Sequence, residues 1–226
     1  MFKKTLALLA FAFPILSISA SISQPLSNIE PFIHAYIGIG PALNMQFFQS
    51  DYLDFATDTY HVVNYGNYGA SGQLHAGYNR GFISNSVIGL DVHAQYNGTS
   101  ASVHSHNNIP AYHSNQMPWQ FGISPKIGYV LNHNLFYILA GPEWAQIKNH
   151  EVSESGQVDI QTQQYKFGGL FGFGLSQNIS PNLNIVEQFS YGIYQGFTQY
   201  LANGDSSMLK NPADVTVLLA LKYHFG

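Results

Sequence analysis

The chain has 226 residues, of which 46% are hydrophobic and only 9% are charged, with a formal net charge of −4. Typical soluble domains carry about 25% charged residues, so this composition disfavours an ordinary soluble domain, and the excess of acids disfavours a nucleic-acid partner. No run approaches the roughly 18 apolar residues of a transmembrane helix, and the absence of cysteine excludes disulfides and thiolate chemistry.

The N-terminus has the features of an export signal. Lys3 and Lys4 precede an apolar run at 5–16, which is followed by small residues that are typical of a cleavage region. We therefore predict a signal peptide over 1–20, an N-terminal periplasmic segment over 21–32, and a mature domain over 33–226.

Alternating apolar and polar residues define eight segments of about ten residues in the mature chain. The even number and the alternation are typical of single-chain bacterial barrels. The expected fold is all-β, a transmembrane antiparallel up-and-down β-barrel with short periplasmic turns and four long extracellular loops. The predicted strands are residues 33–44, 71–79, 87–96, 119–131, 135–146, 164–176, 183–196 and 214–225.

The apolar face of each strand is expected to meet lipid. In the last strand, Val215, Val217 and Leu219 alternate with polar or charged positions such as Asp214 and Thr216. Aromatic side chains gather at the two membrane surfaces of such barrels. The predicted aromatic girdle comprises Trp119 and Trp144 on the outer side and Tyr129, Phe136 and Phe225 on the periplasmic side.

Four residues conflict with this pattern. Pro41, Pro125 and Pro142 fall inside predicted strands, where proline removes a hydrogen-bond donor, so we expect bulges there. Glu187 shares its parity with apolar neighbours, and we expect a bulge to turn it inward; the alternative is a position at the periplasmic rim.

Charged residues of lumen parity come from five strands and nearly balance in sign. Buried charges need partners, and an eight-stranded lumen is narrow enough for side chains to fill, so we expect a plugged interior. The alternative is an ion path or gate. The predicted lumen charge cluster is Asp91, Lys126, Glu143, Lys166 and Lys222, in which we expect Lys126 and Glu143 to be neighbours.

The predicted outer loops are acidic and aromatic. Their acids are Asp51, Asp54, Asp58, Glu151, Glu154, Asp159 and Asp205, and seven Phe and Tyr residues lie between Phe47 and Tyr68. Long loops on a rigid scaffold commonly bind ligands, which favours surface interaction. The alternative is that the strands extend beyond the bilayer and the aromatics pack on one another.

Histidine and serine raise two further alternatives. His104, His106 and His113 could ligate a transition metal, but no acid or cysteine lies near them, so we expect a solvated loop, no metal and no cofactor. Histidines of lumen parity, including His75, His93 and His224, are expected to be hydrogen-bonded fillers. His113 with Ser114, or His93 with Ser102, could serve a lipid A acyl hydrolase, although we expect no enzymatic activity.

The first strand contains Ala35-Tyr36-Ile37-Gly38-Ile39-Gly40, the fifth contains Tyr137-Ile138-Leu139-Ala140-Gly141-Pro142-Glu143, and an aromatic strand ends the chain. With the signal segment, this pattern resembles the small outer-membrane β-barrel proteins, which include the OmpA-type membrane domains and the opacity-type surface antigens. The resemblance implies a bacterial outer-membrane location and a structural or adhesive role. It also implies recognition of the terminal aromatic residue by the barrel-assembly machinery, although here Gly226 follows Phe225.

The expected function is therefore surface exposure of acidic, aromatic loops, in adhesion or envelope integrity. A narrow porin-like channel is the first alternative and a lipid A-modifying enzyme the second. The expected partners are outer-membrane lipid and lipopolysaccharide, the barrel-assembly machinery, and a host or surface ligand at the loops.

Overall fold

The computed structural model describes residues 29–54, 59–82, 85–103, 112–152, 159–200 and 206–225. The predicted signal peptide and most of the predicted periplasmic segment lie outside these residues. Among the described residues, no helix is long and apolar enough to cross a bilayer.

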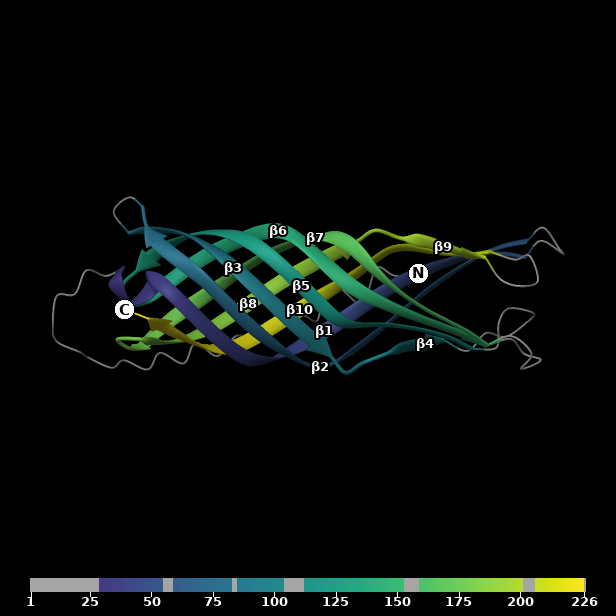
Figure 1. Ribbon diagram of the computed structural model, residues 1–226, viewed down its shortest axis with the longest axis horizontal. Coiled ribbons are helices and arrows are strands. Elements are labelled where there is room, and N and C mark those ends of the chain that lie inside the picture. Colours follow the sequence, from purple (N-terminus) through teal and green to yellow (C-terminus); the bar gives the residue numbers. More distant parts are fainter. Residues whose placement is uncertain are drawn as a thin grey trace, which may run out of the picture.

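The elements follow one another in an almost purely β order (Figure 1). A short 3₁₀ helix, η1 (Glu30–Phe32), precedes the first strand. The eight long strands are β1 (His34–Asp54), β2 (Thr59–Gly81), β3 (Ser86–Asn97), β5 (Tyr112–Leu131), β6 (Asn134–Val152), β7 (Asp159–Ser180), β8 (Leu183–Tyr194) and β10 (Ser206–Phe225). Two short strands, β4 (Ala101–Val103) and β9 (Phe197–Tyr200), pair with β5 and β10 respectively.

The eight long strands close into an antiparallel barrel. Each pairs with its neighbour along the chain, and β1 also pairs with β10, which joins the two edges of the sheet. Closure satisfies the backbone hydrogen bonds that lipid cannot. The predicted fold class is confirmed.

Connections at one end of the barrel are tight. The β5–β6 turn is Asn132–His133 and the β7–β8 turn is Pro181–Asn182. Asn132 has a φ of 57°, a left-handed conformation that asparagine tolerates better than most residues. This end also holds the C-terminal end of β10, whereas β4 and β9 lie toward the opposite end (Figure 1). The tight turns mark the periplasmic end, as predicted.

The strands are longer than the alternation indicated. The β1–β2 pairing continues to Asp54 and Thr59, and the β6–β7 pairing to Val152 and Asp159. A membrane-spanning strand needs about 9–11 residues, and these have 19 to 23. The first predicted outer loop is therefore mostly strand, which corrects the sequence-based boundaries. We call these outer continuations of β1, β2, β5, β6, β7 and β10 the collar.

The outer wall carries a belt of exposed apolar side chains. Every second residue of the lower halves of the strands faces outward, including Ile37, Ile39, Leu90, Ile127 and Leu219, each at least 45% exposed. The five predicted girdle residues also lie on the outer wall: Trp119, Trp144, Tyr129, Phe136 and Phe225. Trp144 pairs with Phe121, and Trp119 with Gln146, so the two indoles lie close to the same level.

The three strand prolines are accommodated without the expected bulges. The β1–β10 register is the same on both sides of Gly40 and Pro41, and the β5–β6 register is the same on both sides of Pro125 and Pro142. Only the ladder pairs beside the prolines are missing. Bulges occur elsewhere, between Phe47 and Gln49 and between Gln116 and Trp119.

Glu187 is not turned inward. The β7–β8 and β8–β10 registers run past it without a bulge, pairing it with Leu175 and Leu219. Its side chain therefore has outward parity with Ile185 and Phe189, which corrects the prediction. The reason is simple periodicity, because alternation along an unbroken strand fixes the face.

Candidate functional site

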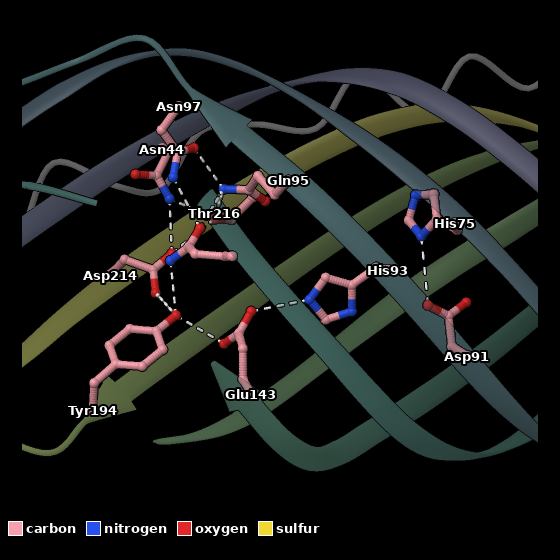
Figure 2. Close-up of polar contacts among 11 residues, drawn as sticks. Asn44, His75, Asp91, His93, Gln95, Asn97, Glu143, Tyr194, Asp214 and Thr216 are labelled. Atoms are coloured by element: carbon pink, nitrogen blue, oxygen red, sulfur yellow. Dashed lines mark hydrogen bonds and ion pairs between the residues drawn. The ribbon is translucent and has the colours of Figure 1, made fainter. Parts of the chain in front are cut away.

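The lumen is filled by polar side chains that form two connected groups. We call them the lower cluster, around Asp91, and the upper cluster, around Glu143 (Figure 2). All are held on strands whose inward positions alternate with the lipid-facing belt. The lumen is thus the place where the chain concentrates its buried charge.

In the lower cluster a single carboxylate faces several donors. Tyr36 Oη donates to Asp91 Oδ2 at 2.5 Å, and Lys222 Nζ lies 3.4 Å from the same oxygen. His75 Nδ1 lies 3.5 Å from Asp91 Oδ1. Lys126 Nζ donates to Tyr36 Oη at 3.0 Å, which links it to Asp91 through the phenol. These groups come from five strands: β1, β2, β3, β5 and β10.

The two buried ammonium groups share one acid and two aromatic rings. Lys126 and Lys222 lie 4.6 and 4.4 Å from the ring centre of Tyr36, and 5.2 and 5.9 Å from that of Tyr137. A cation within about 6 Å of a ring face is attracted by the ring quadrupole. The rings therefore supply stabilisation that Asp91 alone cannot give to two cations.

The upper cluster is centred on two carboxylates. His93 Nε2 lies 3.0 Å from Glu143 Oε1. Tyr194 Oη lies 2.8 Å from Glu143 Oε2 and 2.9 Å from Asp214 Oδ1 (Figure 2). A phenol has a single hydrogen and can donate to only one carboxylate at a time. Both bonds form together when one of the two carboxyl groups is protonated.

Amide and hydroxyl side chains complete the upper cluster. Asn44 Nδ2 donates to Asp214 Oδ2 and to Thr216 Oγ1, each at 2.7 Å. Gln95, Asn97 and Gln120 continue the network at 2.8–2.9 Å, and Gln120 Nε2 donates to Tyr194 Oη at 2.7 Å. Hydrogen bonds of this kind fix the side chains in place.

An apolar group lies at each end of the polar lumen. At the periplasmic mouth, Phe32 of η1 is 1% exposed and packs in a cluster with Val87, Val130, Leu135 and others. At the collar end, Phe48, Met117, Ile147 and Leu209 form a second cluster. Asn97 Nδ2 donates to Met117 O at 2.8 Å, which joins the upper cluster to this cap.

The predicted lumen charge cluster is only partly brought together. Asp91, Lys126 and Lys222 meet in the lower cluster, and Glu143 lies in the upper one. Lys126 and Glu143 are not neighbours, because the register places Leu139 opposite Lys126 and Gly122 opposite Glu143. Lys166 is half-buried, and its Nζ lies 4.7 Å from the ring centre of Phe197.

Sequence reasoning missed Tyr36, Tyr194 and Asp214 as members of the network. Asp214 has lumen parity and could have been included, since it alternates with the apolar residues of β10. The two tyrosines also have lumen parity, since Tyr36 alternates with Ile37 and Tyr194 with Ile193, but aromatic residues were expected on the lipid side. His75, His93 and His224 are buried; His93 and His224 are hydrogen-bonded as expected, whereas His75 has no hydrogen bond and lies only within ion-pair distance of Asp91. Within the described ranges, no group of three metal-ligating side chains occurs.

The predicted surface acids that fall within the described residues lie in the collar. Asp51 lies in β1, where its side chain is 2% exposed and forms an ion pair with Lys210. It is therefore not a loop residue, which corrects the prediction. The backbones of Asp54, Glu151 and Asp159 lie at the ends of β1, β6 and β7, whereas Asp58, Glu154 and Asp205 lie outside the described residues.

Aromatic side chains pack on one another inside the collar. This was the alternative considered for the first predicted outer loop. Phe48 is buried and stacks on Tyr65, with ring centres 5.6 Å apart. Tyr65 Oη also lies 3.0 Å from Ser50 Oγ. The strands do extend past the apolar belt, and some of these aromatics form the inner packing of that extension.

The closed ring of strands, the apolar belt and the polar lumen together define an eight-stranded bacterial outer-membrane β-barrel protein. No protein-family model matches the chain, and no curated protein matches it in sequence. Among solved structures it is similar to the outer membrane protein OprG of Pseudomonas aeruginosa, with a TM-score of 0.62, 9% identity, and coverage of 85% of this chain and 98% of that one.

Two other solved structures are similar at lower TM-scores. Neisserial surface protein A matches with a TM-score of 0.40 and 12% identity over 83% of this chain and 99% of its own. Ail, the attachment invasion locus protein of Yersinia pestis, matches with a TM-score of 0.38 and 15% identity over 82% of this chain and 99% of its own.

Proposed function

We propose that the protein is a closed, non-conducting outer-membrane barrel that displays its outer loops at the cell surface for adhesion. The observation that carries this proposal is the combination of a filled lumen with a strand-built collar. A channel needs a continuous polar path, whereas here an apolar cap stands at each end of the polar network. The collar instead continues the rigid scaffold outward.

The collar supports a display role because it holds loop ends far from the bilayer. The β1–β2 ladder runs at least seven pairs beyond Phe47 and ends at the pair Asp54 and Thr59. At roughly 3.3 Å per residue and a strand tilt of about 40°, the last pair of this ladder lies about 18 Å above the level of Phe47. Loops on a rigid support are well suited to binding.

Adhesion is tested by display on a non-adherent Escherichia coli strain over epithelial cell monolayers. The loop variant replaces residues 55–58, 104–111, 153–158 and 201–205 with Gly-Ser segments of equal length, which leaves the barrel strands intact. We expect the wild-type protein to raise the number of bound bacteria at least several-fold over the loop variant. Equal binding by both, at equal surface amounts, would count against adhesion.

A narrow channel is the competing proposal, and planar-bilayer recording separates the two. Purified wild-type protein is expected to give no discrete conductance steps. Steps that disappear when a lumen position such as Ser190 is changed to Phe would overturn the closed-barrel proposal.

We also propose that the protein is not a lipid A hydrolase. His93 is directed at Glu143 inside the barrel, whereas Ser102 lies exposed on β4, so these two residues are not arranged as base and nucleophile. Mass spectrometry of lipid A from cells with and without the protein is expected to give identical acyl-chain patterns. Loss or gain of an acyl chain on lipid A would contradict this proposal.

A further inference from the structure

Glu187 places a carboxyl group on the lipid-facing wall. It lies on β8 between Ile185 and Phe189, with Leu175 of β7 and Leu219 of β10 beside it in the ladders. All four neighbours are apolar. Among the residues that the structure describes, none forms an ion pair or hydrogen bond with the Glu187 side chain.

The depth of Glu187 follows from the register. Tyr223 of the periplasmic end of β10 pairs with Leu183, and Glu187 is four residues further along β8. At about 3.3 Å per residue and a strand tilt of about 40°, the carboxyl lies roughly 10 Å above Tyr223. The apolar band of such barrels is about 25 Å tall, and Tyr191 and Ile193 continue the outward apolar face above Glu187. The carboxyl is therefore well inside the hydrocarbon layer and away from the lipid headgroups.

An ionisable group at this depth is costly unless it has a partner. A protein partner at this depth must satisfy its own backbone hydrogen bonds, and a second copy of this closed barrel does so. A carboxylic acid is self-complementary, because one carboxyl can donate its hydrogen to another. A two-fold axis along the membrane normal keeps every residue at its own depth and brings identical patches together.

We propose that the β7–β8–β10 face is the contact surface of a symmetric dimer, in which the Glu187 carboxyls of the two copies hydrogen-bond to each other within the membrane. The packing of this face fits such a contact. Phe173 and Phe189 stack with ring centres 5.3 Å apart, and Leu219 beside Glu187 is 53% exposed, so the carboxyl is flanked by apolar surface that is open to a second copy.

Cysteine cross-linking tests the contact, because the natural chain has no cysteine. Ile185→Cys places a thiol beside the proposed axis, and Leu90→Cys, on β3, is the matched control on the opposite wall. Each folded protein is reconstituted in phosphatidylcholine–phosphatidylglycerol vesicles at about 1:2000 protein to lipid and then oxidised. We expect a disulfide-linked dimer from Ile185→Cys, at a yield at least ten-fold above that from Leu90→Cys.

The role of the carboxyl is tested in the Ile185→Cys background. Glu187→Leu is expected to lower the cross-linked yield at least ten-fold, while Glu187→Gln, which can still form an amide pair, lowers it less. Folding of each variant is checked by its heat-dependent shift on gels, and Glu187→Leu should fold because it adds an apolar residue to the lipid face. Equal cross-linking of Ile185→Cys and Leu90→Cys, or an undiminished yield in Glu187→Leu, would overturn the proposal.

Discussion

His93 Nε2 and Glu143 Oε1 lie 3.0 Å apart in the middle of the barrel, joining β3 to β6 across the lumen. The other Glu143 oxygen accepts a hydrogen bond from Tyr194, so this one side chain links three strands. All three side chains are buried. Glu143 is therefore the residue through which the upper cluster ties the wall together.

Glu143→Leu tests this linkage. The apolar side chain is of similar size but has no acceptor oxygen, so His93 loses its carboxylate partner and Tyr194 loses one of its two. Leaving a buried polar group unsatisfied costs about 1–3 kcal/mol, and we expect a loss of that size in the free energy of unfolding, measured by urea titration of refolded protein in micelles. Lys148→Gln, on the exposed outer surface of β6, is the control and should change it by less than about 0.5 kcal/mol. Equal values for the two variants would contradict the role of Glu143.

Asp91 is expected to be the critical charge of the lower cluster. Asp91→Asn leaves Lys222 and Lys126 without a nearby acid, and breaking a buried ion pair by removing one partner costs about 3–5 kcal/mol. Adding Lys222→Met to this variant removes the unpaired charge and should recover part of the loss. The measurement is a double-mutant cycle of urea unfolding free energies. Additive effects of the two substitutions would show that the residues are not coupled.

The alternation of side chains was sufficient to predict the closed barrel and which face of each strand meets lipid. It could not predict the collar, because both faces of the strands there are polar or mixed and no period of two remains. Alternation also predicts the outward direction of the Glu187 side chain correctly. The bulge was expected instead because a charge in lipid is costly. The periodic signal was the better guide to geometry.

Partners across the lumen could not be read from the order of strands. Lys126 was expected near Glu143 because their strands are adjacent, but its hydrogen bond goes to Tyr36, which is 90 residues away in sequence. In a narrow barrel, inward side chains from distant strands meet at the axis. Pairing along the wall therefore says little about which buried charges neutralise one another.

Phe32 is expected to hold the periplasmic cap in place. Its side chain is 1% exposed. Two amide side chains hold the backbone there: Asn79 Nδ2 donates to Phe32 O at 2.8 Å, and Asn184 Nδ2 donates to Pro31 O at 3.1 Å. Phe32→Ala should lower the free energy of unfolding by about 3–5 kcal/mol, as for other buried phenylalanines. Phe82→Ala, at a side chain that is 64% exposed directly after β2, should cost less. The order of the two urea midpoints checks the prediction, and a reversed order would contradict it.

Gly40 is expected to be needed where proline interrupts the β1–β10 ladder. A Cβ at Gly40 would lie 2.0 Å from the carbonyl oxygen of Leu219, a backbone atom that cannot move aside without opening the wall. Gly40→Ala should therefore force a backbone shift that lowers the free energy of unfolding by about 1–3 kcal/mol. It should also reduce the fraction of protein that shows the heat-dependent gel shift of a folded barrel. Gly169→Ala is the control, because nothing lies within 4 Å of its added Cβ. Normal folding of Gly169→Ala beside impaired folding of Gly40→Ala would tie the loss to this close approach, and normal folding of both would show that the wall can widen at the proline.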